Sequence, residues 1–182
     1  MKGALRRCAP AVLLVLGAGC GKQAPAAPAG PRLETRWTGG DTAGFAAPAV
    51  GEWCDTLDLL EIRAAAGDTG IALAIYPGDS VQPGDYPIRP PDVADTASPS
   101  AAMALRWVAQ TAVRGFRSDS GTLTLHRAAD GALSGSFTIH AHAVSDAVRL
   151  MVTGSFEDVH PRPVTRGCTP RVASPDSAAG VD

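Results

Sequence analysis

The chain has 182 residues, of which 45% are hydrophobic and only 5% aromatic, and its formal net charge at pH 7 is −2. Acidic and basic residues are mixed along it, which disfavours a nucleic-acid-binding or anionic-membrane surface. The scarcity of aromatic side chains disfavours a stacking surface for bases or sugars.

The first twenty residues predict an export signal. Three basic residues within the first seven precede an apolar run at 11–16. That run is too short to cross roughly 30 Å of hydrocarbon as a helix. Small residues then lead to Cys20, so residues 1–19 are predicted to be a signal peptide.

Leu16-Gly17-Ala18-Gly19-Cys20 resembles the lipobox of bacterial lipoproteins. In that family the cysteine receives a diacylglycerol, and cleavage on its N-terminal side makes it residue one of the mature protein. The resemblance implies that Cys20 anchors this chain to a membrane. Gly17 departs from the pattern, since the family usually has a branched residue there. The alternative is a secreted soluble protein, cut after a small-residue site such as 24–26.

The residues after Cys20 refine this prediction. Gly21 stands where the inner-membrane retention signal of Gram-negative bacteria usually places Asp, so the resemblance implies the outer membrane facing the periplasm in such a host. Residues 20–31 are rich in Pro and Ala, which predicts a tether. Residues 172–182 are small and polar, which predicts a disordered tail and leaves 32–171 as one domain.

Two cysteines remain in the predicted domain. Cys8 leaves with the signal peptide and Cys20 is assigned to lipid, so Cys54 and Cys168 are the simplest disulfide pair in an exported protein. A metal pair or a reactive thiol is the weaker interpretation, because neither cysteine has a second cysteine or a histidine beside it.

Alternating apolar and polar residues predict strands along the domain. In the N-terminal half, apolar Leu57, Leu59, Leu60 and Ile62 also allow a short helix in place of the first strand. A long loop is predicted at 89–100, and the candidate strands are 56–63, 70–76, 85–88 and 102–113.

The C-terminal third predicts a three-stranded meander at 121–127, 133–142 and 148–156. The turns predict these opposite pairs: Leu123 with Phe137, His126 with Ser134, Ile139 with Leu150, and Gly135 with Gly154. This register places large apolar side chains on one face and Thr, Ser and His on the other. The repeat Gly-Ser-Phe, at 135–137 and 154–156, indicates either a bend of the sheet or a close approach to a ligand.

About eight short strands without a long helix predict an all-β fold, namely a single antiparallel β-sandwich or a small β-barrel. The three tryptophans at 37, 53 and 107 are expected in its core, or else around a pocket for an apolar molecule.

His140 and His142 are the sharpest candidates for chemistry, because they share a strand face and neutral imidazoles bind Zn²⁺ or Cu²⁺. Asp119 would approach His140 if the first meander strand began earlier, whereas His126 lies several residues away. A polar, solvent-facing sheet surface explains the same pattern more simply. No nucleophile elbow, phosphate-binding loop or His-Glu-x-x-His motif occurs.

The sequence therefore predicts a non-catalytic, lipid-anchored protein of the cell envelope that has a binding or structural role. Its membrane contact is the anchor at Cys20, and neither a cofactor nor a nucleic-acid partner is expected. Two alternatives stay open: a carrier of small hydrophobic ligands inside a barrel, and a metal-binding protein that uses His140 and His142.

Overall fold

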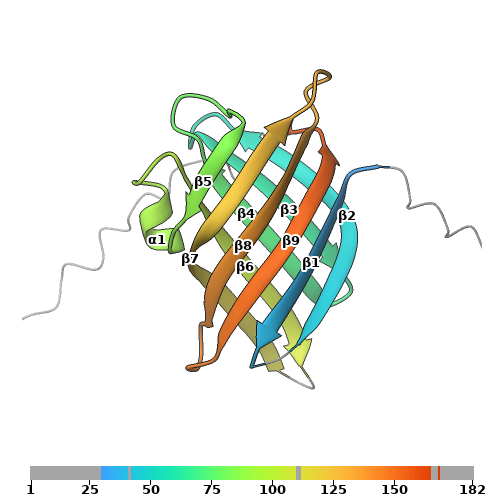
Figure 1. Cartoon of the computed structure of the whole chain (residues 1–182), viewed down its shortest axis with the longest axis vertical. Coiled ribbons are helices and arrows are strands. Elements are labelled where there is room, and N and C mark those ends of the chain that lie inside the picture. The colour runs from blue at the N-terminus through green and yellow to red at the C-terminus, as the bar shows by residue number, and fades with distance from the viewer. Residues whose placement is uncertain (1–29, 41, 110–111, 165–167, 169–182) are drawn as a thin grey trace, which may run out of the picture.

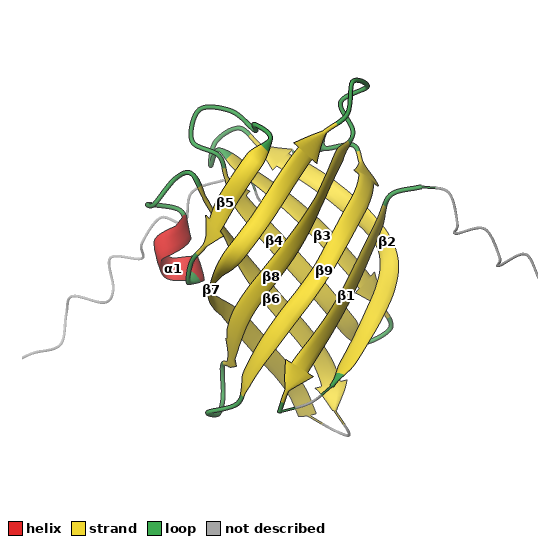
Figure 2. Ribbon diagram, in the orientation of Figure 1, coloured by secondary structure: helices red, strands yellow, loops and turns green. Residues whose placement is uncertain are grey.

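The computed structural model describes residues 30–40, 42–109, 112–164 and 168. Their strands close into a β-barrel, which confirms the all-β prediction and selects the barrel over the sandwich (Figure 1). One four-residue helix, α1 (Pro91–Ala94), lies outside the barrel wall (Figure 2). In the described part of the chain no helix is long and apolar enough to cross a membrane.

The barrel strands are β1 (Arg32–Gly39), β2 (Ala43–Cys54), β3 (Leu59–Ala66), β4 (Thr69–Tyr76), β5 (Gly84–Ile88), β6 (Ser100–Ala109), β7 (Ala112–Arg127), β8 (Leu133–Ala143) and β9 (Arg149–Val159). Successive strands are antiparallel neighbours around the barrel, except that β5 lies between β7 and β6 and pairs in parallel with β6. The sheet closes because β1 pairs with both β2 and β9. A short strand, β10 (Arg162–Pro163), pairs in parallel with the end of β2.

The long strand β7 has two different partners on one side. Its first part pairs with β6 and its second part with β5. Ser118 is fully buried and lies at the point of β7 where its pairing changes from β6 to β5. Its hydroxyl accepts a hydrogen bond from the Met103 amide (2.9 Å) and donates one to the Arg89 carbonyl (2.7 Å). The hydroxyl thus satisfies two backbone groups that the ladder leaves unpaired there.

We expect Ser118→Ala to lower the free energy of unfolding by about 2 kcal/mol, because both backbone groups would lose their buried partner. Urea unfolding of the purified chain measures this difference. Ser136→Ala is the matched control, since Ser136 lies exposed on the outer face of β8, and it should change stability by less than about 0.5 kcal/mol. Equal losses in the two variants would show that the bridge does not stabilise the fold.

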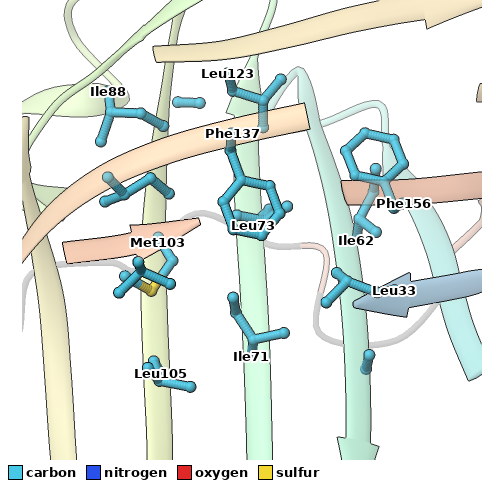
Figure 3. Close-up of a cluster of buried hydrophobic side chains, with 14 of the residues drawn as sticks. Leu33, Ile62, Ile71, Leu73, Ile88, Met103, Leu105, Leu123, Phe137 and Phe156 are labelled. Carbon is cyan, nitrogen blue, oxygen red and sulfur yellow. The ribbon is translucent and has the colours of Figure 1, made fainter. Parts of the chain in front are cut away.

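Apolar side chains from facing strands occupy the barrel interior (Figure 3). Near the end where β1 and β6 finish, Trp37 stacks on Trp107 with ring centroids 5.0 Å apart, and Trp107 stacks on Phe116 at 4.7 Å. The core prediction is therefore confirmed for Trp37 and Trp107. Trp53 is only partly buried, and its indole donates a hydrogen bond to Asp55.

The predicted pairing of β7 with β8 is confirmed, with Leu123 opposite Phe137 and His126 opposite Ser134. The predicted pairing of β8 with β9 is wrong by two residues, because Ile139 lies opposite Val152. The reason is that β8 continues to Ala143, whose amide bonds the Val148 carbonyl, so the turn starts one residue later. A shift of two residues keeps every side chain on its predicted face.

This shift also explains the repeated Gly-Ser-Phe. Gly135 lies opposite Phe156 and Gly154 lies opposite Phe137, so the prediction that the two glycines face each other is wrong. A Cβ on Gly135 would come within 2.7 Å of the Phe156 ring, and a Cβ on Gly154 would overlap the Phe137 ring. Each glycine therefore makes room for the phenylalanine of the other repeat, which is a packing role.

Other local expectations need correction. The segment 59–66 is a strand, so the helical alternative there is wrong. The candidate strand 102–113 spans a hairpin instead, because β6 ends at Ala109 and β7 begins at Ala112. The loop predicted at 89–100 contains α1. No strands were predicted at β1 and β2. The Ala, Gly and Pro residues of 43–49 in β2 carry little β-propensity, whereas the alternation of Leu33, Thr35 and Trp37 in β1 was overlooked.

Candidate functional site

The predicted site residues lie in three places. Cys20 is outside the described residues. Cys54, the last residue of β2, is joined to Cys168 in the predicted disulfide, with their Cα atoms 5.5 Å apart. His140 and His142 lie on the outer face of β8, as the alternation predicted.

Asp119 contacts His142 and not His140. Its carboxylate lies 2.6 Å from His142 Nδ1 and accepts a second bond, 3.1 Å long, from the Arg149 guanidinium. The expected approach to His140 fails because the register of β7 against β8 shifts between Ser118 and Ser120. Asp119 is the extra residue at this shift and has no partner on β8 in the register. His140 instead lies opposite Ser120 and Met151, and its side chain faces solvent.

A metal ion has little to bind on this face. The Asp119 carboxylate is already shared between His142 and Arg149. No three His, Cys, Asp or Glu side chains gather into a possible metal site among the described residues. His126 remains near the other end of β7, opposite Ser134.

The outer wall carries a row of basic side chains that was not predicted from the sequence. Cross-strand pairing places Arg63 of β3 beside Ala72 of β4 and then Ala104 of β6. The same row continues through Arg117 of β7 and His142 of β8 to Arg149 of β9. The neighbouring row adds Arg106, which lies opposite Gly115.

An outer concavity of about 650 Å³, the arginine groove, is hollowed into this part of the wall. It extends across the wall from β2 to β7, because the outward-facing residues at its centre are glycine and alanine, which leave the surface hollow. The residues that define it here are Arg63, Gly70, Ala72, Ala104, Arg106 and Arg117.

The arginines of the groove differ in their electrostatic state. Arg63 is held by two carboxylates, Glu52 at 2.5 Å and Glu61 at 3.2 Å. Arg106 and Arg117 have no ion-pair partner in the described part of the chain, and both face solvent. The groove therefore combines an apolar floor with two uncompensated positive charges on one side.

A second outer concavity, of about 710 Å³, lies over β1, β2 and β9. Its rim contains the ion pair between Arg32 and Glu34, with 2.6 Å between nitrogen and oxygen, and its floor is lined by threonines and serine as well as by Phe45. Its lining is more polar than that of the arginine groove, which makes it the weaker candidate for a binding site.

Near the start of β6 the surroundings are acidic. Tyr76, the last residue of β4, lies opposite Ser100. Burial raises the pKa of the Tyr76 hydroxyl above its ordinary value, and the carboxylates of Asp95 and Glu61 raise it further.

Arg106 and Arg117 belong to one hairpin without acidic residues, but dozens of residues separate them from Arg63 in the sequence. Ala72 and Ala104 were the sequence feature that came nearest to indicating a groove, because an outward-facing strand position usually carries a larger polar residue. No protein-family model, curated protein or solved structure matches this chain.

Proposed function

We propose that this protein is a non-catalytic, lipid-anchored protein of the cell envelope that binds its partner through the outer wall of the barrel. The observation that carries the proposal is the contrast between interior and wall. Apolar side chains occupy the interior, whereas both of the concavities described above lie outside it. This contrast supports the wall as the binding surface more than it supports a carrier with an internal cavity.

Two further features support the cell-envelope location. A disulfide is the state expected of paired cysteines in an oxidising compartment, and Cys54 pairs with Cys168. The lipobox-like sequence places Cys20 twelve residues before Arg32, where β1 begins. Fully extended, that tether would reach about 40 Å, enough to hold the barrel clear of a membrane surface.

The experiment is expression of the full chain in a Gram-negative host fed labelled palmitate. The wild-type chain should take up the label and sediment with the outer membrane. Cys20→Ala should carry no label and should appear in the soluble periplasmic fraction, whereas Cys8→Ala, the matched control, should behave as wild type. A wild-type chain that is soluble and unlabelled would support the secreted alternative instead.

A further inference from the structure

We infer that the arginine groove binds an amphipathic carboxylate, the simplest being a long-chain fatty acid. Its carboxylate would lie between Arg106 and Arg117, and its alkyl chain would lie on the floor formed by Gly70, Ala72 and Ala104. This ligand would make the proposed function more specific. The inference rests on that function only in assuming that the outer wall of the barrel is the binding surface.

The head-group site is formed by two arginines on neighbouring antiparallel strands. Arg106 lies opposite Gly115 and Arg117 opposite Ala104, so the two are diagonal neighbours on the same face. Diagonal neighbours on a sheet are about 7–8 Å apart, which lets two long side chains converge on one anion. The guanidinium group matches a carboxylate in shape and charge, and the small residues opposite leave room for it.

Arg63 does not compete for the head group. Its guanidinium is held by Glu52 and Glu61, which neutralise its charge on the β3 side of the groove. The free positive charge thus lies on the β6–β7 side alone. A ligand with one charged end and one apolar end matches that distribution.

The floor favours an alkyl chain over a peptide. Strands β3, β4 and β6 are each paired on both sides along the floor, so their backbone donors and acceptors are already in the ladder. A peptide lying across them would bury its own N–H and C=O groups without partners, at a cost that an alkyl chain does not incur. The closed sheet also offers no free strand edge here to which a peptide could add.

The extent of the groove fits a long chain. From Arg117 on β7 to Val50 on β2 the lining crosses four strand spacings, which is roughly 19 Å. Val50 and Pro48 provide apolar side chains at the far end, and Val144 does so near the arginines.

The test is isothermal titration of the full chain carrying Cys20→Ser, so that no attached acyl group competes. Decanoate, laurate and myristate are added below their micelle-forming concentrations. Affinity should rise two- to fourfold for each added methylene group, as burial of the alkyl chain requires. Methyl laurate, which has no charge, should bind at least tenfold more weakly than laurate.

Variants separate the head site from the floor. Arg106→Gln/Arg117→Gln should weaken laurate binding at least tenfold, whereas Arg36→Gln/Arg89→Gln, which removes the same charge elsewhere, should change it less than twofold. Ala104→Leu should also abolish binding by filling the floor. Thermal unfolding of each variant checks that the barrel is intact.

Three results would overturn the inference. The first is binding of laurate to the Arg106→Gln/Arg117→Gln chain as tight as to the parent chain. The second is displacement of laurate by acetate or inorganic phosphate at concentrations close to that of laurate itself. The third is binding of a glutamate-rich peptide where laurate does not bind. Because the titration uses unacylated protein, its outcome is independent of the palmitate-labelling result. Failure of the anchor and failure of the groove are therefore distinguishable.

Discussion

Removing the disulfide, with Cys54→Ala/Cys168→Ala, is expected to lower the free energy of unfolding by roughly 5 kcal/mol. The bond links residues 114 positions apart, and a cross-link of that span removes much of the conformational freedom of the unfolded chain. It also ties the segment after β10 to the end of β2. Urea unfolding, analysed with the slope of the transition as well as its midpoint, measures the loss.

Wild-type protein unfolded under strong thiol reduction is the control, and it should lose about as much stability as the double variant. Agreement between the two would assign the effect to the covalent link and not to the packing of Cys54, which is itself buried. A loss below about 1 kcal/mol in both would contradict the expectation.

The second large effect is expected from Gly154→Ala, which should lower the free energy of unfolding by about 3 kcal/mol. The added methyl group would overlap both the Phe137 ring and the Glu34 carbonyl oxygen, so a strand or a core ring must shift. Gly135→Ala should act similarly, because its Cβ would meet the Thr124 carbonyl at 2.6 Å and the Phe156 ring at 2.7 Å. Thermal and urea unfolding both report this change.

Gly115→Ala is the matched control. It is also a strand glycine, but the nearest atom to its new Cβ would be a Val144 methyl at 3.8 Å, which is ordinary contact. That variant should be as stable as wild type or slightly more stable, because alanine restricts the unfolded chain. If Gly154→Ala unfolds at the same urea concentration as Gly115→Ala, the reciprocal packing of glycine and phenylalanine does not stabilise the barrel.

The predictable part of the fold is the part that local pattern and short turns control. The pairing of β7 with β8 followed from alternation and from the turn around Gly131, and it is confirmed. The next hairpin was displaced by two residues because Ala143 and Val148 pair before the turn begins. Strands β1 and β2 were not assigned. The alanines and glycines of β2 acquire strand structure by pairing with neighbours, whereas the buried and exposed residues of β1 alternate in a pattern that local reasoning could have used.

On the outer face of β8, too, local pattern predicts which face a residue occupies but not which residue it contacts. Alternation placed His140 and His142 on it correctly. The partner of Asp119 depended on an irregularity in β7 that short-range pattern does not reveal, so the carboxylate meets His142 and Arg149. The arginine groove was missed altogether, because the hairpin that carries Arg106 and Arg117 meets Arg63 and the small residues of β4 only through pairing between strands far apart along the chain.

By itself, the sequence determined the pairing of Cys54 with Cys168 and the inward or outward face of most meander residues, and it predicts an export signal, which stays a prediction. These follow from composition, from cysteine count and from a side-chain period of two. Only the tertiary structure decided that β1 closes on β9 and that Arg106 and Arg117 stand together over a floor of alanine and glycine. The physical reason is that the register between strands is a long-range property. It places Gly70 and Ala72 of β4 beside the two arginines of the β6–β7 hairpin, although β4 and the hairpin are far apart in the sequence.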